Sequence, residues 1–353
     1  MVALLWTCAA LIGAAGLVAL LLWMVYAPIV ARSFSDPPWF PPRRGEITPD
    51  DYPEGVFDAE RVSFETTDGV RLAGTCLPTL AADRKGVVIF CHEYRGSQAI
   101  ALAFTSGLRD AGFDVLAFDF RDHGESQKTM PHGPLPWATE DEAADISAAI
   151  DFCCRRDSRL AGRIVLFGLS RGASAALCVA AADSRVQATI LDSICPTERV
   201  QLHLIRRFMF LHIRAWPGLA KLPDWTLTML AFWANRVIER QRGCRILAVD
   251  RAARRISKPV LMIHGGRDAI APLETAYSLR KRMRNRPKMW VVSEARHNEA
   301  VFEVGEEYRC RVARFLTRLA CEPSHDDIPR ERSVLAAIMH DNATQCDVAP
   351  ASI

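Results

Sequence analysis

The sequence predicts an α/β fold in which a largely parallel sheet is covered by helices on both faces. The prediction rests on apolar runs that alternate with segments of helical spacing such as DEAADISAAIDFCCRR. The apolar runs lie at residues 86–91, 113–120, 163–168, 186–191, 259–265 and 288–294. Strands buried on both faces of a parallel sheet read as continuous apolar runs separated by helices.

Composition indicates one large domain with appendages. The chain has 353 residues, of which 50% are hydrophobic, enough to bury a substantial core. Its eleven cysteines are scattered without a CxxC pair, which favours reduced thiols and argues against a zinc site. The net charge of only +3 gives no indication of nucleic-acid binding.

Residues 1–31 contain no charged side chain, and roughly 20 apolar residues suffice to cross a bilayer. Trp6 lies near one end of this stretch, and Trp23 and Tyr26 lie near the other, where aromatic rings prefer the membrane interface. We therefore expect a transmembrane anchor. The alternative is a cleaved signal peptide, but no basic residue precedes the apolar run.

The basic residues nearest to this stretch follow it, at Arg32, Arg43 and Arg44. The positive-inside rule then places the rest of the chain in the cytoplasm. Unpaired cysteines agree with that side of the membrane. A periplasmic or lumenal domain is the alternative.

The rest of the chain divides by composition. Residues 32–58 include DPPWFPPRRG, whose prolines cannot continue a helix, and are expected to form a linker. Residues 59–321 form the expected catalytic domain, which opens with a hairpin around the Asp-Gly pair of RVSFETTDGVRLAGTCLP. Residues 322–353 form a polar tail.

The motif GLSRG marks a candidate nucleophile. Ser170 follows an apolar run and precedes an Ala-rich predicted helix. Gly168 and Gly172 flank it, and small residues there allow the strained strand-to-helix turn that exposes a hydroxyl. The alternative is an ordinary turn residue, and the strand-turn-helix context favours the nucleophile.

A serine hydroxyl needs a histidine base that a carboxylate orients, in the chain order Ser, Asp or Glu, His for this architecture. Asp268 and His297 each come directly after an apolar run and satisfy that order. Asp192, which follows another run, competes for the carboxylate role. We assign it to a loop cap or lid hinge.

The tetrahedral intermediate of such a reaction needs amide donors for its negative oxygen. One comes from the residue after the nucleophile and one from a loop after an early strand. Arg171 supplies the first backbone amide, and we expect Tyr94 in CHEYRGS to supply the second.

Several motifs together resemble the α/β-hydrolase superfamily, and within it the serine aminopeptidase-like (lysophospholipase, hydrolase 4) group, over about residues 61–319. They are CHEYRGS, FDFRDHGES, GLSRG, LDS, HGGRD and the terminal His297. The resemblance implies a mostly parallel eight-stranded sheet with helices on both faces and a helical lid. Arg121 and His123 are expected to be structural. Glu93 and Arg296 stand where the family commonly has glycine, and Glu93 changes the surroundings of the second oxyanion donor.

Residues 196–258 depart from the strand-helix alternation, at the place where the resembling family inserts a lid. They hold thirteen Lys or Arg against four Asp or Glu. Leu204, Phe208 and Leu211 share one face of a predicted amphipathic helix. This face either packs on its own domain or contacts anionic lipid or an acyl substrate.

These residues predict a membrane-anchored serine hydrolase that cleaves carboxylic esters, lipid acyl esters among them, through an acyl-enzyme. The alternatives are a peptidase or amidase, a thioesterase, and a noncatalytic scaffold of the same fold at the membrane. The expected partners are a small-molecule ester or lipid substrate and the bilayer. No metal, organic cofactor or nucleic acid is implied, and the sequence gives no prediction of oligomeric state.

Overall fold

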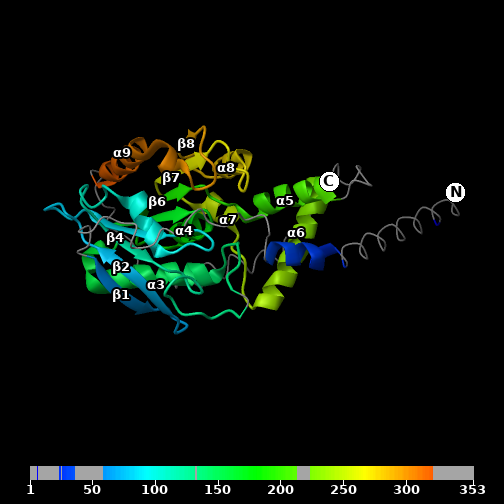
Figure 1. Cartoon of the computed structure of the whole chain (residues 1–353), viewed down its shortest axis with the longest axis horizontal. Coiled ribbons are helices and arrows are strands. Elements are labelled where there is room, and N and C mark those ends of the chain that lie inside the picture. The colour runs from blue at the N-terminus through cyan, green and yellow to red at the C-terminus, as the bar shows by residue number, and fades with distance from the viewer. Residues whose placement is uncertain are drawn as a thin grey trace. The chain divides into compact units, whose positions relative to one another are not determined.

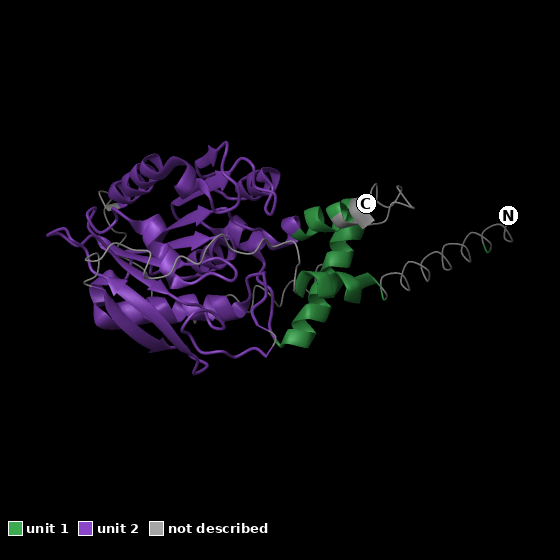
Figure 2. Cartoon of the chain, in the orientation of Figure 1, with its two compact units in different colours: residues 1–40, 201–243 green, residues 41–200, 244–353 purple. Residues whose placement is uncertain are grey.

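The computed structural model describes residues 6, 24, 26–35, 59–131, 133–212 and 223–320. The chain divides into two compact units (Figure 2). Unit 1 comprises Met1–Phe40 and Gln201–Gly243, and unit 2 comprises Pro41–Val200 and Cys244–Ile353. The sheet and the helices that cover it belong to unit 2.

The core of unit 2 is an eight-stranded sheet in the order β1-β2-β4-β3-β5-β6-β7-β8 (Figure 1). The strands are β1 (Glu60–Glu65), β2 (Arg71–Leu77), β3 (Gly86–Cys91), β4 (Phe113–Phe118), β5 (Ile164–Leu169), β6 (Val186–Asp192), β7 (Val260–Gly265) and β8 (Met289–Val292). β2 pairs antiparallel with β1 and β4, and the other neighbours pair in parallel. The predicted mostly parallel eight-stranded sheet is confirmed.

Helices cover both faces of this sheet. They are α2 (Ala101–Thr105), α3 (Glu140–Arg156), α4 (Arg171–Ala182), α7 (Val249–Arg255), α8 (Leu273–Arg280) and α9 (Ala300–Ala320). Side chains of α3, α4, α7 and α8 form one apolar core with the sheet, and those of α2 and α9 form the other. β3 alternates between the two, with Val87 and Ile89 in the first core and Val88 and Phe90 in the second, as the two-residue period of a strand requires.

The start of α3 shows why this helix begins where it does. The Thr139 side chain caps the first amides, and the Glu142 side chain accepts a hydrogen bond from the Thr139 amide at 2.7 Å. This reciprocal capping satisfies donors that have no acceptor inside the helix. Acidic residues fill the first turn, and Arg155 and Arg156 lie in the last, so the charges also match the helix dipole.

Unit 1 contains α6 (Asp224–Arg242), most of α5 (Thr197–His212) and a helical stretch at residues 26–35. The side-chain amides of Gln201 and Asn235 join α5 to α6 through hydrogen bonds of 2.7 and 3.0 Å. In the helical stretch, three side chains at helical spacing are buried. They are Ala27, Ala31 and Phe34.

Several expectations concern the chain termini and the insertion. α5 and α6 fall within residues 196–258, and the side chains of Phe208 and Leu211 lie outside the described residues. Among the residues that the structure describes, no helix combines the length and apolar character needed to cross a membrane. Most of the stretch 1–31 lies outside those residues, as do most of the linker and the whole tail. Residues 32–35, expected to begin the linker, continue the helix instead.

Candidate active site

The turn after β5 presents Ser170 in a strained backbone conformation. Its φ is 50° and its ψ is −111°, a combination that costs energy for a residue with a side chain. The flanking glycines make the turn sterically feasible. A Cβ on Gly168 would come within 2.4 Å of the Ala173 Cα, and one on Gly172 within 2.2 Å of the Cys91 carbonyl oxygen. The strand-turn-helix context expected for GLSRG is therefore present.

The structure brings Ser170, His297 and Asp268 together. The Ser170 hydroxyl lies 2.7 Å from His297 Nε2, and His297 Nδ1 lies 2.7 Å from an Asp268 carboxylate oxygen. An Nδ1–H donated to the carboxylate leaves Nε2 as the acceptor for the hydroxyl proton. This is the arrangement that activates a serine nucleophile.

The Asp268 carboxylate is fixed on both oxygens. One accepts hydrogen bonds from the Ile270 and Ala271 amides at 2.9 and 2.8 Å, and the other faces His297. Burial alone would raise the pKa of this carboxyl, but His297 and the Ala271 amide bring it below its ordinary value. Burial alone would likewise lower the pKa of His297, but the Asp268 charge raises it well above its ordinary value. The pair thus makes the imidazole a stronger base.

Asp192 does not contact the imidazole as an orienting carboxylate would. Its carboxylate accepts hydrogen bonds from the Tyr308 hydroxyl at 2.7 Å and from Ser193 at 2.9 Å. The Ser193 oxygen in turn accepts from the Asn298 amide at 3.1 Å, and the Ser170 amide donates to the Asp192 carbonyl at 2.9 Å. Asp192 and Ser193 therefore tie the turn of Ser170 to the loop of His297. This role differs from the expected loop cap or lid hinge.

The side chain of Arg171 is buried, with 1% of its surface exposed. Its guanidinium pairs with Glu142 at 3.1 Å and donates to the Leu135 carbonyl at 2.7 Å and to His123 Nε2 at 3.1 Å. The same Glu142 caps α3, so the start of that helix and the turn of Ser170 share one carboxylate. The Arg171 amide lies in the first turn of α4, where amides have no acceptor inside the helix.

The loop after β3 approaches the Ser170 turn through Tyr94. The Arg171 guanidinium lies over the Tyr94 ring at 5.8 Å, and the Arg95 guanidinium lies over it at 5.0 Å. The side chains of the two residues expected to supply oxyanion donors are therefore in contact. The role of the Tyr94 amide stays a prediction.

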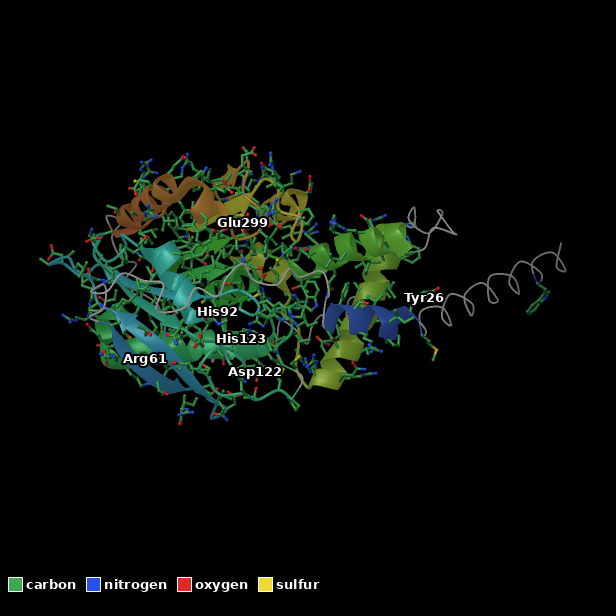
Figure 3. All side chains as sticks on the ribbon, viewed as in Figure 1. Tyr26, Arg61, His92, Asp122, His123 and Glu299 are labelled. Carbon is green, nitrogen blue, oxygen red and sulfur yellow. The ribbon has the colours of Figure 1, made fainter. Side chains whose placement is uncertain are left out.

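Two histidines lie beside this loop. His92 donates from Nδ1 to the Glu93 carbonyl at 2.7 Å and accepts at Nε2 from the Phe120 amide at 3.1 Å. His123 packs edge-to-face on it with ring centroids 4.9 Å apart, and both are labelled in Figure 3. Burial, helped by the Arg171 charge, holds the pKa of His123 well below its ordinary value. A neutral, fully bonded imidazole fits the structural role expected for His123.

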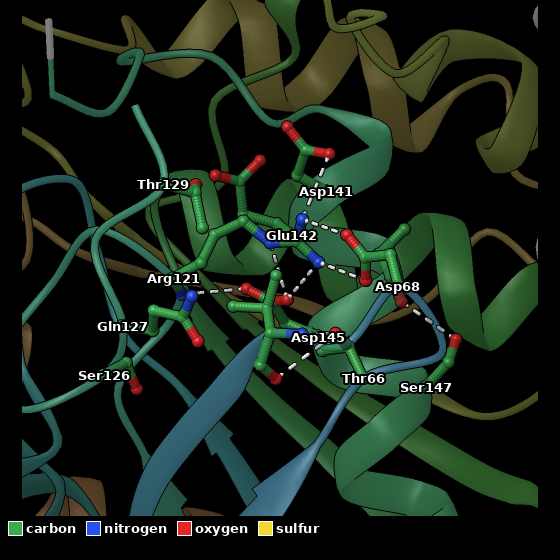
Figure 4. A network of polar contacts seen from close by, with 12 residues as sticks. Thr66, Asp68, Arg121, Ser126, Gln127, Thr129, Asp141, Glu142, Asp145 and Ser147 are labelled. Atoms are coloured by element: carbon green, nitrogen blue, oxygen red, sulfur yellow. Dashed lines mark hydrogen bonds and ion pairs between the residues drawn. The ribbon is translucent and has the colours of Figure 1, made fainter. Parts of the chain in front are cut away.

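Arg121 also has a structural environment (Figure 4). It pairs with Asp145 at 2.7 Å, Asp68 at 2.8 Å and Asp141 at 3.4 Å. These contacts connect the loop after β4 to α3 and to the β1–β2 turn. They agree with the structural role expected for this residue.

Three side chains near the candidate site were not predicted from the sequence. Cys195 Sγ lies 3.4 Å from the Ser170 hydroxyl, Tyr308 holds Asp192, and Glu142 holds Arg171. Only Glu142 had a sequence signal, because the spacing of Thr139 and Glu142 is that of a capping box. In the described part of the chain, no group of three or more acidic, His or Cys side chains is arranged to hold a metal ion.

Residues 88–314 match the model of the alpha/beta hydrolase family, and the chain belongs to that family. The match is to the broad family, so the narrower serine aminopeptidase-like group stays a prediction. The solved structure of the Pyrococcus furiosus esterase Pf2001 is 25% identical with a TM-score of 0.56, and the alignment covers 79% of this chain and 97% of that one.

Among curated relatives, the uncharacterized protein YfhR of Escherichia coli is 33% identical over 152 residues. The chain spans about half the length of that relative, 51%, and 41% of this chain is aligned. The uncharacterized protein YqkD of Bacillus subtilis is 26% identical over 240 residues, covering 67% of this chain and 73% of the relative.

Proposed function

We propose that this protein is a serine hydrolase that cleaves carboxylic esters through an acyl-enzyme. The observation that carries the proposal is the pair of 2.7 Å contacts joining Ser170 to His297 and His297 to Asp268. Three side chains distant in sequence would not meet in this order, at a strained turn, for stability alone. A structural serine needs neither a base nor a backbone strain.

In the proposed reaction, the Ser170 oxygen attacks the ester carbonyl while its proton passes to His297 Nε2. The Arg171 and Tyr94 amides stabilise the resulting oxyanion. Collapse of the intermediate breaks the ester bond, and His297 returns the proton to the leaving alcohol. Water then repeats the sequence on the acyl-enzyme, which releases the carboxylic acid and restores the serine.

Esters are the proposed substrates because the structurally similar Pyrococcus furiosus protein is an esterase. Amides, peptides and thioesters react by the same steps and are the alternatives. We further propose that residues 1–31 anchor the chain in a membrane, with unit 2 in the cytoplasm. The uncharged composition of that stretch and the arginines that follow it support this part.

Labelling with a fluorophosphonate tests the chemistry, because these reagents modify an activated serine. We expect the wild-type chain to be labelled and Ser170→Ala to remain unlabelled, while Ser158→Ala, a change at an exposed serine before β5, stays labelled. A wild-type chain that resists the reagent would make the noncatalytic scaffold the better account. A panel of p-nitrophenyl esters, monoacylglycerols, lysophospholipids and aminoacyl amides would then rank the substrates, and faster cleavage of amides than of every ester would reject the ester proposal.

A further inference from the structure

α6 is apolar on two opposite sides. Leu227, Ala231, Ala234 and Ile238 follow one another at helical spacing and are buried. Two residues before the first of them, another apolar stripe begins, formed by Trp225, Met229 and Trp233. We call these three side chains the outer stripe. Residues two apart lie on nearly opposite sides of an α-helix, and residues four apart lie on the same side.

The outer stripe is exposed. Trp225, Met229 and Trp233 expose 66, 40 and 44% of their surfaces. A helix of a soluble domain normally has one apolar face, which it buries, and a polar face toward water. α6 therefore has a second apolar face, and this face is exposed.

Exposed apolar side chains are concentrated in unit 1. Among the described residues, ten large apolar side chains are exposed, and seven belong to this unit. The seven are Trp6, Met24, Tyr26, Ile29, Trp225, Met229 and Trp233. Large apolar side chains are usually buried in soluble proteins, and an excess of exposed ones in one unit is typical of a unit that binds a partner.

We propose that the outer stripe of α6 contacts the surface of a lipid bilayer. Residues 1–31 carry no charged side chain, and the described residues among them belong to the same compact unit as the stripe. Tryptophan is the side chain most suited to the boundary between acyl chains and headgroups. This inference does not depend on the chemistry proposed for Ser170.

Charge at the end of the stripe fits the same occupant. Arg236 and Arg240 continue the outer side of α6 beyond Trp233 at helical spacing. Arg236 lies near Glu239 at 3.4 Å and over the Phe232 ring at 5.3 Å, and Arg240 is exposed. On one side of the helix, the tryptophans can contact the acyl-chain boundary of a bilayer, and the arginines beyond them can contact anionic headgroups.

Fluorescence quenching by brominated lipids tests the contact. The full chain is reconstituted into vesicles of phosphatidylcholine and phosphatidylglycerol with or without brominated acyl chains. Trp225→Phe with Trp233→Phe should reduce the quenched part of the emission. Trp290→Phe, in β8 of unit 2, should leave it unchanged. An equal quenched part in the wild type and the double variant would overturn the proposal.

A second measurement separates a bilayer from a second copy. Trp225→Ser with Met229→Ser and Trp233→Ser should reduce the quenched part of the emission and leave the oligomeric state in detergent, measured by size-exclusion chromatography, as in the wild type. Leu80→Ser, an exposed apolar residue of unit 2, is the matched control and should change neither. Quenching that stays unchanged while the triple variant turns an oligomer into a monomer would show that the stripe is a contact between copies. Failure of fluorophosphonate labelling with intact quenching would reject the hydrolase and leave the stripe in place.

Discussion

The side chains around Ser170 and those of the outer stripe of α6 differ in how far their contacts are made within the chain. Around Ser170, each polar side chain of the candidate site is held by at least one partner within the chain, and Asp268 is held on both oxygens. Along α6, three large apolar side chains are exposed to solvent. The side chains of the first region are held mainly by partners within the fold, whereas those of the second are exposed and available to a partner. Substitutions should therefore disturb chemistry and stability in the first region and association in the second.

The largest effect is expected at Ser170, the proposed nucleophile. Ser170→Ala should lower turnover of an ester by roughly 10^6-fold, because loss of one triad member disables the whole unit. His297→Ala should do the same, whereas Ser158→Ala, at an exposed position, should retain full activity. Steady-state kinetics measures this, and a loss of under about tenfold would remove Ser170 from the chemistry.

Asp268→Asn should lower turnover by roughly 10^4-fold, since the amide no longer holds the imidazole in the productive tautomer. It should also move the acid limb of the pH profile to lower pH. The Asp268 charge raises the pKa of His297, and a protonated imidazole cannot accept the hydroxyl proton. Asp192→Asn should move that limb less, and a larger shift there would make Asp192 the orienting carboxylate.

Glu142→Gln should lower the free energy of unfolding by about 3–5 kcal/mol, because the buried Arg171 guanidinium loses its counter-charge. Chemical denaturation measures the change. Asp151→Asn is the control, since its pair with Arg185 is part-exposed and Arg185 keeps Asp183. A change under about 1 kcal/mol is expected there. Equal losses of unfolding free energy in both variants would mean that the buried Glu142–Arg171 pair contributes no more to stability than the part-exposed Asp151–Arg185 pair.

Tyr308→Phe should lower the free energy of unfolding by about 1.5–3 kcal/mol, the usual cost of removing a hydrogen bond to a charged group. Burial raises the pKa of Asp192 to about 6, and the Tyr308 bond acts in the opposite direction. The loop of His297 should loosen, so that kcat falls while KM is unchanged. Tyr277→Phe, at an exposed position, should change neither, and an unaltered kcat in Tyr308→Phe would limit Tyr308 to stability.

The smallest effect is expected on the outer stripe in the absence of lipid. Trp233→Ser should change the free energy of unfolding by no more than about 0.5 kcal/mol, as exposed positions usually do. Leu227→Ala on the buried side of the same helix should cost about 2–5 kcal/mol. If the two variants unfolded alike, the stripe would be packed within the protein and not directed toward a partner.

The sheet could be predicted from the sequence because each strand is a short apolar run. The predicted runs and β3 to β8 agree to within two residues at every end. Ser170, Asp268 and His297 could be found because each follows a strand of such a sheet, and parallel strands end at one edge. The required chain order then selected His297 as the base and favoured Asp268 over Asp192 as the carboxylate.

Side-chain partners could not be predicted in the same way. Tyr308 reaches Asp192 across 116 positions, and no periodicity encodes that meeting. A cysteine carries no signal that it will lie beside a serine hydroxyl, as Cys195 does. The capping box of α3 predicts where the helix starts but not that Glu142 will also bind Arg171. The three apolar residues of the outer stripe are recognisable in the sequence because they are four positions apart. Only the structure shows that they are exposed while the other apolar side of α6 is buried.

β8 has four residues and lies at the edge of the sheet, and it is the strand that delivers His297. An edge strand has a neighbour on one side only, so fewer bonds must break to release it than for any central strand. Gentle warming should therefore free the histidine loop through local opening while β3 and β5 are still paired. Local opening of β8, and not global melting, would then set the temperature at which activity is lost. Amide hydrogen exchange along β8 measures this opening.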